Sequence, residues 1–196
     1  FNLNFIKEHY PWFLDTYNSY PHNIQRADSM RPFYLFHYGG LYVDMDFFCL
    51  KNFNNVFKNG GVFILKSSSF GYTNSMMASS KNHPFWKRYF DKMLQHKKQK
   101  WYQTHHLYIM ASAGPLRLTE CVKEYKNNDM VILPGKLFNP CGPCKKTCNA
   151  NAEIYSYTLN SASWAKVDTK IFNFILCYNS IIVLIILIIY LRTRSN

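Results

Sequence analysis

The most informative stretch of this chain is Gly39-Gly40-Leu41-Tyr42-Val43-Asp44-Met45-Asp46. Alternate residues of a β-strand share a face, so a strand over Leu41 to Phe48 would point Asp44 and Asp46 the same way, with Tyr42 beside them. Two carboxylates this close repel each other unless a cation lies between them. Mg²⁺ and Mn²⁺ prefer oxygen ligands of this kind and keep water or substrate phosphate in their other positions. A solvated strand end is the alternative interpretation.

An acid and an arginine precede the glycine pair. Asp28 and Arg31 are three residues apart, so they share one face of the helix that we predict over Gln25 to Tyr38. We expect Gly39 to end this helix. Pro32 falls in its first turns, where proline is tolerated, which would place Arg31 near the helix start. Alone, the pair would be a surface ion pair; followed by Asp-x-Asp, it indicates a binding site.

The order of these features resembles the sugar-transferase family that carries an Asp-x-Asp motif, with relatives among yeast initiating mannosyltransferases and inositol-phosphoceramide mannosyltransferases. More distantly it is similar to the glucosylating clostridial toxins. Weaker matches follow in the family's order, over about residues 8 to 165: Asn74, Met77-Ala78-Ser79, His83-Pro84-Phe85, Gly114-Pro115, Leu118-Thr119 and Ser163-Trp164. The resemblance implies an α/β, Rossmann-like nucleotide-sugar-binding domain of the GT-A-like kind. The family usually opens with an earlier strand that helps to hold the base, so we expect an N-terminally truncated domain.

The resemblance also implies roles for the first group of residues. Asp44 and Asp46 would be the catalytic pair: Asp46 would ligate Mn²⁺ or Mg²⁺, and Asp44 would share the metal or hold donor hydroxyls. Asp28 would accept hydrogen bonds from ribose or sugar hydroxyls. Arg31 would offer its planar guanidinium to the phosphates or the donor sugar, and Tyr42 would line the same pocket.

Three more donor-binding positions are implied. Asn74 would bond sugar hydroxyls, unless it only caps a loop. Ser163 and Trp164 would meet the diphosphate across the metal. Many family members carry a histidine a few residues earlier, but residues 157–164 contain none, so the third protein ligand is open. The family retains anomeric configuration, yet no acid after Asp46 lies in a recognised motif, and we assign no nucleophile.

Composition predicts one domain with a sizeable core. The 196 residues carry a formal charge of +12, but residues 1–46 alone are net acidic. Residues 81–100 hold seven bases and one acid. Such a surface attracts phosphate on lipid or on a nucleotide sugar; a solvated helix face is the alternative. We expect no nucleic-acid partner.

Residues 171–191 contain no charged side chain and are followed by Arg192 and Arg194. About 20 apolar residues span a bilayer, so we predict a transmembrane helix over 171–191, a catalytic domain over 1–166 and a short basic tail over 192–196. A buried core helix is the alternative. The anchor would give a single-pass protein of the Golgi or a related endomembrane.

Three of the six cysteines cluster in a loop over residues 140–149, at positions 141, 144 and 148. The Cys-Gly-Pro-Cys sequence is that of redox sites, but no strand and helix flank it as a reactive thiol would require. We expect a structural disulfide with the third cysteine paired elsewhere. A zinc site that recruits Cys121 or a histidine is the alternative.

Alternating strands and helices favour an α/β layer structure. Besides the helix and strand around Gly39, we predict helices over Phe5 to Tyr20, His83 to Leu94 and Leu116 to Tyr125, and strands over Gly60 to Lys66 and Met130 to Leu133. The strand over Gly60 to Lys66 is apolar throughout and should be central. His105 and His106 are interpreted as packing or solvent residues.

The predicted function is metal-dependent transfer of a hexose from a nucleotide sugar to a lipid-linked or glycan acceptor. A metal-dependent phosphoesterase or nuclease is one alternative, although it would normally need more acids or histidines around paired metals. A non-catalytic, membrane-tethered sugar-binding protein is the other.

Overall fold

The protein, seen here in a computed structural model, is a mixed α/β fold, and the structure describes residues 1–142, 144, 153–159 and 165–178. Its helices are α1 (Asn2–His9), the 3-10 helix η1 (Pro11–Phe13), α2 (Leu14–Ser19), α3 (Asn23–Tyr38), α4 (Phe85–Gln95), α5 (His105–Ser112), α6 (Pro115–Glu124) and α7 (Gly135–Phe138). Residues 167–178 form a further helix. The strands are β1 (Gly40–Val43), β2 (Phe47–Cys49), β3 (Val62–Lys66), β4 (Tyr72–Ser79), β5 (Met130–Leu133) and β6 (Ser156–Thr158).

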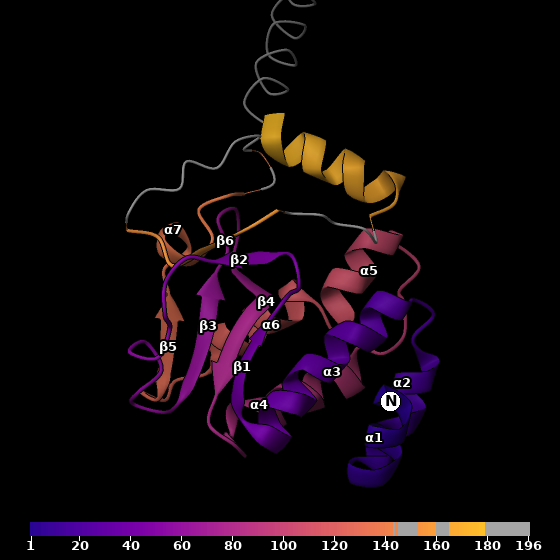
Figure 1. The fold of residues 1–196 in the computed structure, drawn as a ribbon. Coiled ribbons are helices and arrows are strands. Elements are labelled where there is room, and N and C mark those ends of the chain that lie inside the picture. The colour runs from indigo at the N-terminus through magenta and orange to yellow at the C-terminus, as the bar shows by residue number, and fades with distance from the viewer. Residues whose placement is uncertain (143, 145–152, 160–164, 179–196) are drawn as a thin grey trace, which may run out of the picture.

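The main sheet has the strand order β1-β4-β3-β5. Strand β4 is antiparallel to both β1 and β3, and β3 is parallel to β5. Strands β1, β3 and β5 therefore end at the same edge of the sheet. Figure 1 shows helix 167–178, in yellow, lying across this edge, with the small β2–β6 sheet beside it. Ligands of α/β sheets bind at such strand ends.

Strand β3 connects the two halves of the core. Val62 and Ile64 pack with the helices that cover one face of the sheet. Phe63 and Leu65 point to the other face, where they pack with Leu133, Phe138 and the loop before β3. All four side chains are buried, so this strand is interior to the sheet and covered on both faces, as its continuous apolar sequence predicted.

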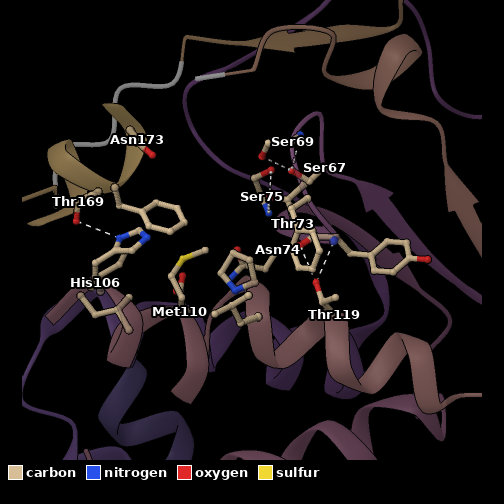
Figure 2. Close-up of a pocket in the computed structure, with 18 of the residues that line it drawn as sticks. Ser67, Ser69, Thr73, Asn74, Ser75, His106, Met110, Thr119, Thr169 and Asn173 are labelled. Carbon is tan, nitrogen blue, oxygen red and sulfur yellow. Dashed lines mark hydrogen bonds between the residues drawn. The ribbon is translucent and has the colours of Figure 1, made fainter. Parts of the chain in front are cut away.

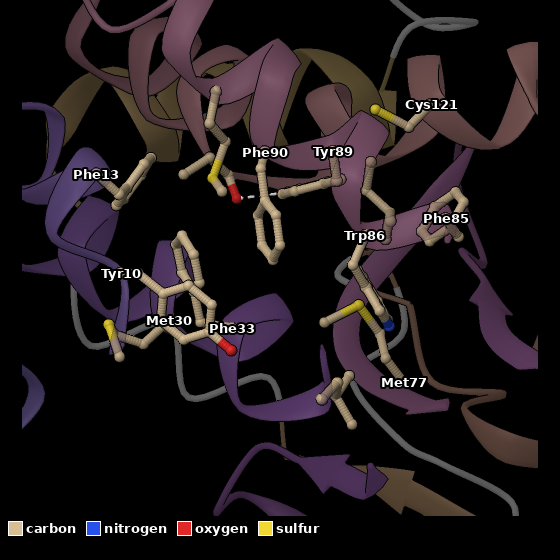
Figure 3. Packing of buried hydrophobic residues seen from close by; sticks show 14 of the residues in the cluster. Tyr10, Phe13, Met30, Phe33, Met77, Phe85, Trp86, Tyr89, Phe90 and Cys121 are labelled. Atoms are coloured by element: carbon tan, nitrogen blue, oxygen red, sulfur yellow. Dashed lines mark hydrogen bonds between the residues drawn. The ribbon is translucent and has the colours of Figure 1, made fainter. Parts of the chain in front are cut away.

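Aromatic side chains fill the helical half of the core (Figure 3). The rings of Phe33 and Phe90 stack at 4.2 Å and join α3 to α4. Two of the buried aromatic residues also make hydrogen bonds: the Tyr89 hydroxyl donates to the Ala113 carbonyl at 2.7 Å, and the Trp86 indole N–H donates to the Ser79 hydroxyl at 2.9 Å. This dense packing fixes α3, which carries Asp28 and Arg31, against the sheet.

The predicted helix over Phe5 to Tyr20 is wrong as a single element. The chain forms α1, η1 and α2 instead. Tyr10 ends α1, and Pro11 follows at the start of η1. Proline lacks the N–H that an uninterrupted helix would need at this point.

The helix predicted over Gln25 to Tyr38 is confirmed as α3, and Gly39 ends it with a positive φ of 71°. The expected position of Pro32 is wrong. The helix already begins at Asn23, where Gln25 Oε1 accepts from the His22 N–H at 3.3 Å. Pro32 therefore lies in the helix interior, and Arg31 is well beyond the first turn.

The other predicted elements appear as α4, α6, β3 and β5. The sequence analysis missed β4, α5 and β6. Strand β4 has the sequence YTNSMMAS, in which polar and small residues hide the strand pattern. It is nevertheless the strand between β1 and β3.

The C-terminal helix contacts the domain. The His106 N–H donates to Asp168 Oδ2 at 2.6 Å, and His106 Nδ1 lies 3.1 Å from the Thr169 hydroxyl. A disulfide joins Cys144 to Cys177. Contacts of the chain with itself thus extend beyond residue 166, where the catalytic domain was expected to end.

Among the residues that the structure describes, no helix is long and apolar enough to cross a membrane. The predicted span over 171–191 is described only over residues 171–178, and residues 179–191 lie outside the described part. Within that part, Cys177 is covalently tied to the loop around Cys144.

We expected a structural disulfide with the third cysteine of the cluster paired elsewhere, and the structure shows one bond from the cluster to a distant cysteine, Cys144–Cys177. Cys141 is also disulfide-bonded, and Cys148 lies outside the described residues. The zinc alternative is not supported within the described residues: Cys121 is free and buried, and no group of three histidine, cysteine or acidic residues is arranged to hold a metal there.

Candidate active site

Arg31 is the centre of a buried charge cluster. Its Nη2 lies 3.0 Å from Asp28 Oδ1 and 3.0 Å from Asp44 Oδ1. Its Nη1 donates to the backbone carbonyl of Asn74 at 2.9 Å. One arginine of α3 thus joins its own helix to the end of β1 and to the middle of β4.

Tyr42 completes this cluster from β1. Its hydroxyl donates to Asp44 Oδ1 at 2.7 Å, and the Arg31 guanidinium lies over its ring, 5.0 Å from the centroid. The structure therefore brings together five residues that the sequence singled out: Asp28, Arg31, Tyr42, Asp44 and Asn74.

The strand predicted over Leu41 to Phe48 is wrong in one respect that affects the site. Strand β1 ends at Val43, and Asp44 to Asp46 form a turn in which the Phe47 N–H donates to the Asp44 carbonyl at 3.2 Å. The turn arises because β1 pairs with β4, whereas β2 pairs with β6 in the second sheet. Asp44 and Asp46 line the same cavity, but they do so from a turn and not from one strand face.

Burial dominates the electrostatics of the cluster. The pKa of Asp28 is raised to about 6. Burial is the largest cause, the charge of Asp44 adds to it, and the charge of Arg31 opposes it. The pKa of Asp44 is also raised by burial, while Arg31 and the Tyr42 hydroxyl oppose this shift. Burial disfavours the charge of Arg31, but both carboxylates outweigh it and raise the arginine pKa. Asp28, Asp44 and Asp46 line the cavity together with a single arginine, Arg31, so this part of the cavity carries an excess of acidic groups.

This excess fits a divalent cation. Carboxylate oxygens are the ligands that Mg²⁺ and Mn²⁺ prefer, and Mg²⁺ commonly uses one or two carboxylates plus substrate phosphates. Asp44 Oδ1 already contacts Arg31 and Tyr42. Direct ligation by Asp46 stays a prediction from the motif. Within the described residues no third acidic, histidine or cysteine ligand joins this pair, so the donor phosphates would have to supply further oxygens.

The charge cluster lies at one end of a cavity of about 1340 Å³. The volume is large enough for a nucleotide sugar. Figure 2 shows part of this cavity, with Asn74 and Thr119 in one region and with His106 in contact with Thr169 of the C-terminal helix in another. Apolar side chains of that helix, including Phe172 and Ile175, line the far wall. The cavity is therefore charged around Arg31 and has an apolar wall on the side of the C-terminal helix, with Asp168 at the start of that helix.

Several cavity residues were missed by the sequence analysis. A hydroxyl-rich group follows β3 and starts β4, and it consists of Ser67, Ser68, Ser69, Thr73 and Ser75. The run of three serines directly after an apolar strand was the available signal. His106 was interpreted as a packing or solvent residue; it is buried and lines the cavity, and burial lowers its pKa.

The remaining predicted donor-binding residues, Ser163 and Trp164, lie outside the described residues. Thr158 and Asp168, which are described, both line the cavity. The roles assigned to them stay predictions.

Comparison with known proteins identifies the class. A family model described as the glycosyltransferase sugar-binding region containing DXD motif matches residues 1–63, the segment that contains Asp28, Arg31, Asp44 and Asp46. The resemblance predicted from the sequence is confirmed: the chain is related to the glycosyltransferases that carry this region.

Two individual relatives have names that fit this class. The chain is 43% identical over 122 residues to a mannosyl phosphorylinositol ceramide synthase of Saccharomyces cerevisiae, covering 62% of this chain and 32% of the relative. It is 38% identical over 125 residues to inositol phosphoceramide mannosyltransferase 2 of Schizosaccharomyces pombe, covering 63% of this chain and 35% of the relative. Among solved structures, PaToxG glycosyltransferase matches with 17% identity and a TM-score of 0.42, over 63% of this chain and 40% of that chain. The chain thus spans about a third of the length of these two yeast relatives.

Proposed function

We propose that this chain is the donor-binding part, of the GT-A-like kind, of a metal-dependent hexosyltransferase that uses a nucleotide sugar. The observation that carries the proposal is the Asp28–Arg31–Asp44 cluster, which lies with Asp46 in one large cavity and within the segment matched by the family model. The names of the yeast relatives supply the rest: we infer mannose as the sugar and an inositol phosphoceramide as the acceptor.

Each residue of the site has its own proposed role. Asp46 would hold Mn²⁺ or Mg²⁺, which when bound neutralises the leaving diphosphate. Arg31 is held rigidly by Asp28, Asp44 and the Asn74 carbonyl, so it is preorganised to bind the donor without a further loss of side-chain entropy. Asp28 and Asp44 would accept hydrogen bonds from donor hydroxyls. We propose retention of the anomeric configuration, with no protein nucleophile assigned.

The acceptor would be a membrane lipid, and we propose an endomembrane site such as the Golgi. The apolar wall made by residues 171–178 would then face the acceptor. A transmembrane anchor is proposed only for a segment that includes residues 179–191.

Asp46→Asn tests the metal assignment. The neutral amide is a poor ligand for a hard cation, so we expect Mn²⁺-dependent thermal stabilisation by a nucleotide-activated mannose to disappear, and mannosyl transfer to inositol phosphoceramide with it. Asp15→Asn, which alters an exposed acid of α2, is the matched control.

Undiminished transfer by Asp46→Asn would overturn the metal assignment. Donor binding without transfer in the wild-type chain would favour the sugar-binding alternative. Hydrolysis of a phosphodiester, in place of transfer, would favour the phosphoesterase alternative.

A further inference from the structure

Two aromatic side chains are displayed at the tip of the loop between α4 and α5. Trp101 is 96% exposed and Tyr102 is 54% exposed. Their rings contact each other edge to face at 5.6 Å. Tryptophan is usually well buried, so a fully exposed indole next to an exposed phenol marks an interaction surface.

The tip is an ordered turn. The Gln103 N–H donates to the Lys100 carbonyl at 3.0 Å, and Gln103 Oε1 accepts from the Lys100 N–H at 2.8 Å. Gln99 Nε2 donates to the Gln103 carbonyl at 2.8 Å. Trp101 and Tyr102 occupy the two central positions, where glycine, asparagine or proline is usual. Nothing in the turn geometry requires aromatic residues there.

The loop is also basic. Lys97, Lys98 and Lys100 precede the aromatic pair, and residues 96–104 contain no acid. The Tyr108 hydroxyl of α5 donates to the Lys97 carbonyl, which ties the basic segment to the body of the protein. Cations directly beside an amphipathic aromatic pair are the combination that binds the headgroup region of an anionic bilayer.

A second apolar surface adjoins the loop. The loop leads through Thr104, which caps α5 by accepting from the Leu107 N–H, and the next turn holds the C-terminal helix through His106. That helix exposes Phe174 and Tyr178 away from the cavity lining, next to the partly exposed Ile171, Phe172 and Ile175 that line the cavity. Lys166 and Lys170 on the same segment are exposed as well.

We propose that the loop over residues 96–104, together with the exposed face of helix 167–178, is a docking surface for an anionic membrane. Trp101 and Tyr102 insert at the headgroup level, and the lysines bind lipid phosphate. The cavity, whose wall is the same helix, then opens next to the bilayer, and in this respect the proposal rests on the proposed lipid acceptor. A single-stranded nucleic acid also fits lysines and aromatic rings, but it offers no apolar partner for Ile171 and Ile175 of the neighbouring helix.

The test is flotation of the full chain with vesicles of phosphatidylcholine, with or without phosphatidylserine, in the absence of any donor. We expect phosphatidylserine to strengthen binding and salt to remove that increase. Because each lysine near the surface contributes separately, Lys97→Glu with Lys98→Glu should weaken the partition coefficient about tenfold or more. Trp101→Ala should weaken it as well and should abolish the blue shift of tryptophan emission on binding.

The matched control is Lys51→Glu with Lys58→Glu, which changes the net charge equally at exposed positions elsewhere. Equal binding by the two double variants, equal binding with and without phosphatidylserine, or tighter binding to single-stranded DNA would overturn the proposal. Because the assay contains no donor, failure of the proposed glycosyl transfer would leave its result unchanged.

Discussion

At the scale of single residues, the organising feature is that Arg31 binds two carboxylates which would otherwise repel each other. Asp28 and Asp44 come from α3 and from the end of β1, and neither is fully exposed. Removing one member of a buried charge group leaves the others uncompensated, which is costly. The cluster therefore holds the site together before any ligand arrives.

Replacing Arg31 with lysine should not be conservative. A compact ammonium cannot contact Asp28, Asp44 and the Asn74 carbonyl in the same planar geometry. We expect donor affinity or turnover to fall about tenfold or more, which corresponds to the loss of about 1.5–3 kcal/mol of charge-assisted hydrogen bonding. Isothermal titration with a nucleotide sugar, on protein shown to be folded by circular dichroism, measures the effect.

Arg26→Lys is the control, because Arg26 lies on the same helix and its Nη1 donates to Asn23 Oδ1 at 2.7 Å, away from the charge cluster. If Arg31→Lys binds the donor as tightly as Arg26→Lys does, Arg31 has only a structural role.

At the scale of elements, the turn from α3 into β1 decides whether the cluster forms. Gly39 has φ 71° and ψ −165°, a conformation that is essentially restricted to glycine. A Cβ at this position would lie 2.8 Å from the backbone nitrogen of Lys81 and 3.1 Å from the Ser79 carbonyl. The helix and the strand can thus meet at this angle only with glycine between them.

Gly39→Ala should destabilise the fold by more than Gly40→Ala. Both glycines have positive φ, so each substitution should cost about 1–3 kcal/mol in backbone strain. The free energy of unfolding should fall more for the Gly39 variant, because its Cβ meets backbone atoms, whereas nothing lies within 4 Å of a Cβ at Gly40. Urea unfolding of both variants gives the two free energies, and equal values would show that the collision is relieved by a shift of β4.

The sequence predicted elements well where one local signal dominated. Gly39 marked the end of α3, and the apolar run of β3 marked an interior strand. It failed where tertiary pairing overrode the local pattern. Asp44 to Asp46 continue an alternating sequence, yet the chain leaves the sheet there because β2 finds its partner in β6. Strand β4 could not be predicted, because its place in the sheet depends on pairing with β1 and β3 and not on a local sequence pattern.

The same contrast holds for the site. Asp28, Arg31, Tyr42, Asp44 and Asn74 meet as the sequence analysis expected. The apolar wall made by helix 167–178 could not be predicted, because its apolar sequence is equally typical of a membrane span. The contacts that decide its position, from His106 and Cys144, come from elements far away along the chain.

At the scale of the whole molecule, the disulfide between Cys144 and Cys177 closes a separation of 33 residues and restrains the wall of the cavity. Cys177→Ser should lower the free energy of unfolding by about 2–4 kcal/mol, because the unfolded chain regains the entropy of an open loop. Thermal melting under oxidising conditions measures the loss.

Cys49→Ser serves as the control, since Cys49 is a free and exposed cysteine. A Cys177→Ser variant that melts with the Cys49→Ser variant would show that the bond adds no stability. A reductant should lower the melting temperature of the wild-type chain, as expected for a domain that folds in an oxidising compartment.

The position of the cavity wall has a consequence for synthesis. The charged end of the cavity is encoded within residues 28–75, whereas its apolar wall is encoded last among the described residues, at 167–178. A growing chain on the ribosome therefore completes the cluster around Arg31 roughly a hundred residues before it completes the wall. Until then the apolar side of the cavity is uncovered, so this is the interval in which a chaperone that recognises exposed apolar surface would be needed most.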